Sequence, residues 1–126
     1  MEQVIKFFSI GLGGAIGAIG RYWLSGLAQQ FGGRFPLGTL AVNLLGSFLM
    51  GLLAVLFLEK LMVNQEWRLF LLIGILGAFT TYSTFSYETL MLFRSDAWQL
   101  ASLNILANVV GTLLAVWAGY SLAKLW

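Results

Sequence analysis

The fold is decided by one stretch, Gly77-Ala78-Phe79-Thr80-Thr81-Tyr82-Ser83-Thr84-Phe85-Ser86-Tyr87-Glu88. It places hydroxyl groups, two aromatic rings three residues apart and a carboxylic acid inside a long apolar segment. Such groups are costly in lipid unless they face protein, water or an ion. Their position near the middle of a predicted membrane span therefore indicates a pathway for a polar solute.

The residues on either side of this position predict a helix that is broken near mid-membrane. The apolar run from Trp67 to Phe79 is too short to cross alone, because a bilayer core needs about 20 helical residues. Residues 80–84 are rich in hydroxyl groups, which compete with the helical backbone for hydrogen bonds. We expect a break at 80–84 and a resumed helix that contains Glu88. Broken helices expose backbone groups that can hold ions.

The composition is that of an integral membrane protein. Of the 126 residues, 60% are hydrophobic and only 10% are charged, with a mean hydropathy of +0.88, whereas soluble domains contain about 25% charged residues. We expect one all-α domain with four transmembrane helices at about 7–28, 37–58, 67–93 and 97–122. Three spans follow the first, so we read that segment as a retained span rather than a cleaved signal peptide.

Charge and missing residue types narrow the functions. The chain has no histidine and no cysteine, and its net charge is only +2, without a basic run. An enzyme is therefore the least expected class, and neither nucleic acid nor a soluble protein partner is implied. Positive charges favour one side of the membrane only slightly, so one orientation and mixed insertion with antiparallel dimerisation both stay open.

Several polar residues within the spans are candidates for the pathway. Asn43 is either a helix–helix contact or an N–H donor to an anion. Arg21 is either an interfacial anchor or a cation that attracts an anion. Glu88 is the only acid well inside a span, and a structural hydrogen-bonding role is its alternative. The fourth span carries a stripe that suits either a hydrated path or a dimer seam: Asn104, Asn108, Thr112, Ala115 and Gly119.

Glycines and aromatic rings complete the pattern. Gly13 and Gly17 in the first span form a GxxxG pair that predicts close helix packing. Tyr82 and Phe85 share one helix face, where ring edges with partial positive charge can contact an anion. Amides, hydroxyls and ring edges suit a small anion. The sequence has no ring of carboxylates of the kind that a cation pore would favour. A proton-coupled exporter and a structural assembly subunit are the alternatives to a channel.

Three segments together resemble the small bacterial fluoride channels of the Fluc or CrcB family. They are Gly17–Trp23, Gly38–Gly46 with the pattern GTLxxNxxG, and Thr80–Glu88, which is close to TTFSTFSxE. The resemblance covers essentially the whole chain. It implies an antiparallel, dual-topology homodimer in the bacterial inner membrane, with two pores that let fluoride leave the cell passively.

The resemblance also implies roles for individual residues. A structural sodium ion, not transported, would be held on the dimer axis by the backbone carbonyls of Gly77 and Thr80. The fluoride pathway would include these residues: Arg21, Asn43, Tyr82, Ser83, Thr84, Phe85, Glu88, Asn108 and Thr112. The chain departs from the family pattern where Tyr82 replaces a phenylalanine and where Gly77-Ala78-Phe79 replaces Gly-Gly-Leu. Tyr82 adds a hydroxyl to the expected path.

Overall fold

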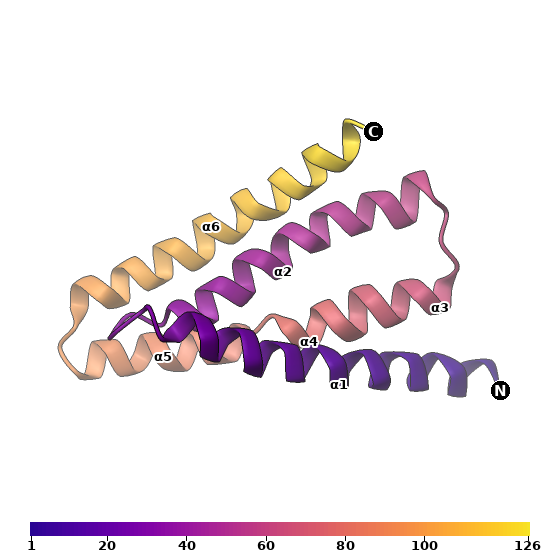
Figure 1. The fold of residues 1–126 in the computed structure, drawn as a ribbon. Helices are drawn as coiled ribbons and strands as arrows, with labels where there is room; N and C mark the ends of the chain where they lie inside the picture. Colours follow the sequence, from indigo (N-terminus) through magenta and orange to yellow (C-terminus); the bar gives the residue numbers. More distant parts are fainter.

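The computed structural model describes residues 1–126 and is entirely helical apart from short connections (Figure 1). Its elements are α1 (Glu2–Gln29), α2 (Leu37–Val55), the π-helix η1 (Leu56–Lys60), α3 (Gln65–Arg68), the π-helix η2 (Leu69–Leu76), α4 (Gly77–Phe79), α5 (Tyr82–Arg94) and α6 (Trp98–Lys124). Four helical segments are long and apolar enough to cross a membrane: Glu2–Gln29, Leu37–Lys60, Gln65–Arg94 and Trp98–Lys124. The predicted all-helical protein with four such segments is confirmed.

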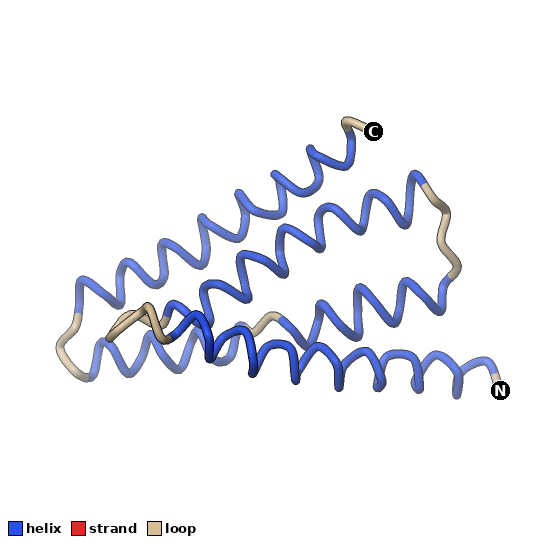
Figure 2. The backbone as a smooth tube through the Cα atoms, in the orientation of Figure 1, coloured by secondary structure: helices blue, strands red, loops and turns tan.

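The helices form two pairs that meet at one end and diverge toward the other. α1 lies along η2 and α4, and α2 lies along α6, as Figures 1 and 2 show. Both chain termini lie at the end where the pairs diverge, and α5 lies at the opposite end, in contact with α6. The single chain is therefore wedge-shaped, with α2 facing the third span across the opening.

Glycines let each pair approach backbone to backbone. A methyl group added at Gly13 or Gly17 of α1 would overlap backbone atoms of η2, including the Ile75 carbonyl in the case of Gly17. A methyl group at Gly51 of α2 or Gly119 of α6 would overlap the facing backbone in the same way. The close packing predicted from the GxxxG pair is confirmed, and small residues are the usual means of such packing in lipid.

The third span is interrupted between α4 and α5. Thr80 (φ −92°, ψ 158°) and Thr81 (φ −150°, ψ 119°) have extended backbone angles. This interval is shorter than the expected 80–84, because the Thr81 hydroxyl accepts the Thr84 N–H at 3.1 Å and caps the new helix. Residues 82–84 consequently form the first turn of α5.

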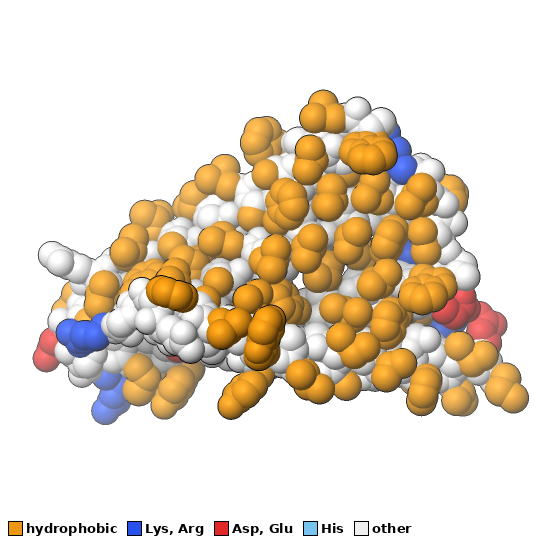
Figure 3. All heavy atoms as spheres, viewed as in Figure 1, with side chains coloured by type: hydrophobic (Ala, Val, Ile, Leu, Met, Phe, Trp, Pro, Cys, Tyr) orange, Lys and Arg blue, Asp and Glu red, His pale blue; other side chains and the backbone are white.

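The outer surface is apolar over most of its length. Figure 3 shows hydrophobic side chains across the visible face, with charged side chains gathered toward the two ends. Only 22 of the 126 residues are buried, so one chain has a very small core of its own. Most of its apolar side chains must face lipid or another protein surface.

Candidate functional site

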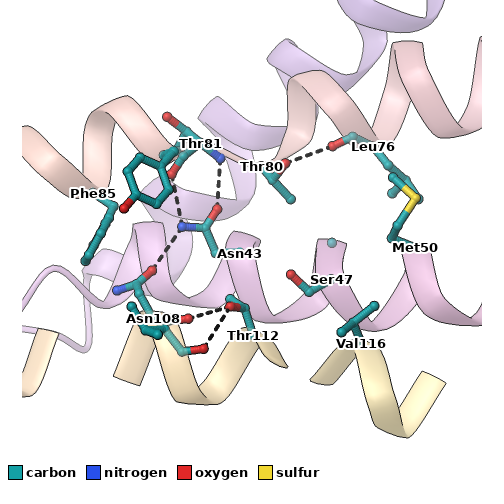
Figure 4. Close-up of a pocket in the computed structure, with 13 residues that line it drawn as sticks. Asn43, Ser47, Met50, Leu76, Thr80, Thr81, Phe85, Asn108, Thr112 and Val116 are labelled. Carbon is teal, nitrogen blue, oxygen red and sulfur yellow. Dashed lines mark hydrogen bonds between the residues drawn. The ribbon is translucent and has the colours of Figure 1, made fainter. Parts of the chain in front are cut away.

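A cavity of about 350 Å³ lies where α2 and α6 face the interruption of the third span (Figure 4). Amides, hydroxyls and rings surround one part of it, and aliphatic and thioether side chains surround the other. No charged side chain lines it. The lining residues are Asn43, Gly46, Ser47, Met50, Leu76, Thr80, Thr81, Tyr82, Phe85, Asn108, Val109, Thr112 and Val116.

Asn43 of α2 holds the interruption through three hydrogen bonds. Its Oδ1 accepts the Thr81 N–H at 2.8 Å, and its Nδ2 donates to the Thr81 carbonyl at 3.0 Å. The same Nδ2 donates to Asn108 Oδ1 of α6 at 3.0 Å (Figure 4). One amide therefore satisfies both backbone groups of an extended residue, in place of the partners that a continuous helix would supply.

The hydrogen bonds continue from Asn108 through the interior to α5. Asn108 Nδ2 donates to Asn104 Oδ1 at 2.9 Å, and Asn104 Nδ2 donates to Thr89 Oγ1 at 2.9 Å. Thr89 then donates to the Phe85 carbonyl at 2.8 Å. Asn104 has no exposed surface. Every link runs donor to acceptor in one direction, and such chains of hydrogen bonds strengthen one another in a low-dielectric interior.

Two aromatic rings border the cavity from the first turn of α5. Their centroids are 5.3 Å apart and their planes meet at 71°, an edge-to-face contact between Tyr82 and Phe85. Phe85 is 6% exposed, whereas Tyr82 is 77% exposed in the single chain. The expectation that these rings share one face holds in the structure, and only one of them is enclosed by the chain itself.

Other predicted residues divide between this cavity and its surroundings. Thr112 lines the cavity, and its hydroxyl donates to the Asn108 carbonyl at 2.5 Å. Arg21 lies outside it and donates from Nε to the Ala78 carbonyl at 3.0 Å, which ties α1 to the end of α4. Ser83 is exposed, and its hydroxyl lies 3.4 Å from that of Thr81. The structure therefore does not bring Arg21 or Ser83 to the cavity.

Thr84 and Glu88 belong to a separate hollow between α1 and α5. This second cavity measures about 540 Å³ and is also lined by Thr39 of α2. Glu88 additionally borders a third cavity of about 500 Å³ that includes Arg34. The Glu88 Oε1 atom is buried without a hydrogen-bond partner. The predicted pathway residues that line a cavity thus fall into two groups, and Arg21 and Ser83 belong to neither.

The carbonyl groups of Gly77 and Thr80 differ from those of a regular helix. The Thr81 N–H, which in a continuous helix would donate to Gly77, donates to Asn43. The Thr84 N–H, which would donate to Thr80, donates to the Thr81 hydroxyl. Both carbonyl oxygens are released from these bonds, and carbonyl oxygens are ligands that hard cations accept.

Most of the apolar lining was not singled out from the sequence, although Gly46 was part of the GTLxxNxxG pattern. Gly46 lets α2 approach the interruption closely, because a methyl group there would overlap the Thr80 side chain. Met50, Leu76 and Val116 form the apolar part of the cavity. Spacing along α2 could have found Met50, since 43, 46 and 50 lie on one helix face. Nothing in the sequence pattern marks Leu76 or Val116 among many similar apolar residues.

Comparison with known proteins gives the family. The family model described as "CrcB-like protein, Camphor Resistance (CrcB)" matches residues 8–120. A protein from Magnetococcus marinus named "Fluoride-specific ion channel FluC" is 53% identical over 117 residues, covering 92% of this chain and 95% of the relative. One from Thermococcus kodakarensis with the same name is 46% identical over 116 residues, covering 92% and 94%.

A third relative is longer than the others. The protein of this name from Methylococcus capsulatus is 49% identical over 121 residues, which cover 95% of this chain but 53% of the relative. The chain thus spans about half the length of that protein. The chain belongs to the CrcB family, as the resemblance of its motifs led us to expect.

Proposed function

We propose that this protein is a fluoride-selective channel that lets fluoride leave the cell passively across the inner membrane and so relieves fluoride toxicity. This proposal depends mainly on one observation, the uncharged polar cavity between membrane-spanning helices. The printed names of its relatives describe fluoride-specific ion channels and support the same conclusion.

The lining of the cavity favours an anion over a cation. Its polar groups include amide N–H and hydroxyl donors beside aromatic ring edges, with no carboxylate. A small anion that accepts strong hydrogen bonds suits such a wall. The apolar residues Met50, Leu76 and Val116 would limit the water in the path. A path with little water favours an ion that specific donors bind.

We propose further that two copies insert in opposite orientations and dimerise, with the interruption near mid-membrane. The wedge-shaped opening leaves Tyr82 and Gly77 exposed in one chain, although both lie in a membrane span. A second copy placed upside down would enclose both copies of the cavity and bury the same patch twice. The weak charge asymmetry across the membrane supports insertion both ways.

A structural sodium ion at the dimer axis is the final part of the proposal. The chain has no cluster of three His, Cys, Asp or Glu side chains that could hold a metal. The released carbonyl oxygens of Gly77 and Thr80 fit a hard cation instead, and two copies would double their number. The ion would brace the dimer without being transported.

Fluoride efflux from proteoliposomes tests the function. Vesicles that contain the purified protein are loaded with potassium fluoride, and valinomycin starts electrogenic release, which a fluoride electrode follows. We expect rapid release of fluoride and retention of chloride. Release no faster than from protein-free vesicles would refute the channel, and a strict requirement for a proton gradient would indicate coupled transport.

Two further measurements test the assembly. Cysteine placed at Arg34 or Lys60, in a chain with no native cysteine, should react with an impermeant reagent from both sides of the membrane. Labelling from one side only would exclude mixed insertion. Replacing sodium with a large organic cation should lower the melting temperature of the dimer, and an unchanged value would count against the axial ion.

A further inference from the structure

The side-chain donors that line the cavity differ in whether the protein already uses them. Both N–H groups of Asn43 are taken, by the Thr81 carbonyl and by Asn108 Oδ1. The amide nitrogen of Asn108 donates to the backbone and side-chain oxygens of Asn104, at 3.0 and 2.9 Å. These amides are thus committed to holding the interruption and the helix seam.

The threonine hydroxyls of the lining are committed as well. Thr80 donates to the Leu76 carbonyl at 3.2 Å, and Thr81 donates to Thr84 Oγ1 at 3.0 Å. Thr112 donates to the carbonyl four residues earlier. None of these hydrogens is available to a ligand unless a bond within the protein breaks first.

Ser47 is different. It lies on α2 one turn beyond Asn43, and its hydroxyl makes no hydrogen bond within the chain, not even to the carbonyl four residues earlier that such side chains often use. Figure 4 shows this hydroxyl directed into the space between α2 and the interruption. Ser47 also marks the boundary between the polar lining and the apolar residues Met50 and Val116.

We infer that Ser47 is an anion-binding residue of this cavity, and that its hydroxyl donates directly to the transported ion. Of the polar side chains in the lining, only Ser47 and Tyr82 have a donor hydrogen with no acceptor in the chain. Asn43, by contrast, acts on the path by positioning Thr81. This inference rests on the proposed function, because it assigns the ligand as a small anion such as fluoride.

Loss of the Ser47 hydroxyl should affect the ion only where it passes this side chain. A desolvated anion needs a donor at each position where it pauses, and a hydrogen bond to a charged group is stronger than one between neutral groups. On α2, Ser47 stands between Asn43 and the apolar Met50, and the threonine hydroxyls of the lining already donate within the chain, so none of them replaces it there. Its removal should slow fluoride transport at least roughly tenfold while leaving the fold intact.

The test compares Ser47→Ala with wild type and with Ser102→Ala in the same fluoride efflux assay. Ser102 is exposed on α6 and lies outside the cavities described above, so its variant controls for loss of a membrane-embedded serine. Ser47→Thr restores a hydroxyl and is expected to recover at least half of the wild-type rate. Gel filtration and circular dichroism establish that each variant is folded.

The outcomes separate this inference from the proposed function. A wild-type protein that releases no fluoride overturns the channel itself. A wild-type rate in Ser47→Ala, when wild type is active, overturns the role of Ser47 alone. If Ser47→Ala does not fold, Ser47→Cys supplies the test: its weaker donor should give a reduced rate, and an unchanged rate overturns the inference.

Discussion

Two of the helix contacts that hold this chain together use different means. α1 meets η2 through Gly13 and Gly17, with backbone against backbone. α2, α5 and α6 meet around the interruption through Asn43, Asn108 and Asn104, which form a continuous chain of amides. In lipid the hydrophobic effect does not draw helices together, so close contact and interhelical hydrogen bonds must do so.

The difference assigns a separate role to each contact. The glycine contact leaves no polar group to interact with a solute, so it serves the fold alone. The amide contact fixes an extended residue, Thr81, and borders the cavity at the same time. Changes in the first contact should therefore alter stability alone, whereas loss of Asn43, which fixes Thr81 at the cavity, should alter transport as well.

The largest effect on stability should come from Gly17→Ala. The added methyl group overlaps the Ile75 backbone, which cannot move without shifting η2. We expect a loss of about 1–3 kcal/mol in the free energy of unfolding, the usual cost of overpacking. Unfolding in mixed detergent micelles measures it. Gly14→Ala is the matched control, because nothing lies near its added methyl group, and equal losses in both variants would refute the contact.

A smaller loss should follow Asn104→Leu. This change removes one of the two acceptors of Asn108 and the donor to Thr89 in a fully buried position, while the Asn104 carbonyl stays. The bond to Thr89 joins two helices, and such bonds in membranes contribute about 0.6 kcal/mol; with the bond lost within α6, we expect a loss of about 1 kcal/mol. Fluoride efflux should stay within a few-fold of wild type, since Asn104 does not line the cavity. A complete loss of efflux from a folded variant would place Asn104 in the path itself.

The smallest effect should come from Lys124→Ala at the chain end. Lys124 forms an ion pair with Glu59 and lies 5.3 Å from the Tyr120 ring centroid, but both charged groups are exposed. Exposed ion pairs add little to stability because water and salt screen them. The melting temperature should not change measurably. A clear decrease in the melting temperature would show that the ion pair at the end of α6 contributes to stability in spite of its exposure.

Much of this architecture could be predicted from residue types. Four apolar runs predicted the four helices, and the hydroxyl-rich segment at 80–84 marked the place where Thr80 and Thr81 are extended. The exact interval could not be predicted, because it depends on a cap that Thr81 forms and on Asn43 from a distant helix. Sequence spacing finds neighbours within one element but not partners between elements.

The candidate site was predictable only in part, because residue type and spacing do not show which residues of different helices meet. Asn43, Phe85 and Thr112 were identified by type and position, and they line one cavity. Arg21 and Glu88 were equally conspicuous as charges within spans, yet Arg21 caps α4 and Glu88 lies in a different hollow. By sequence alone, Ser47 is one more small residue of α2, next to Gly46. Its free hydroxyl becomes evident only after the partners of all the other donors are known.

The role of Asn43 in holding the pathway is tested most directly by the fluoride efflux rate of Asn43→Leu beside that of wild type, with both proteins shown to be folded dimers. Loss of the Asn43 amide frees both backbone groups of Thr81, which removes the constraint that shapes the cavity. Efflux should fall by a factor on the order of 100, the scale of three lost hydrogen bonds of about 1 kcal/mol each. An Asn43→Leu dimer that releases fluoride at the wild-type rate would contradict it and place the pathway elsewhere in the protein.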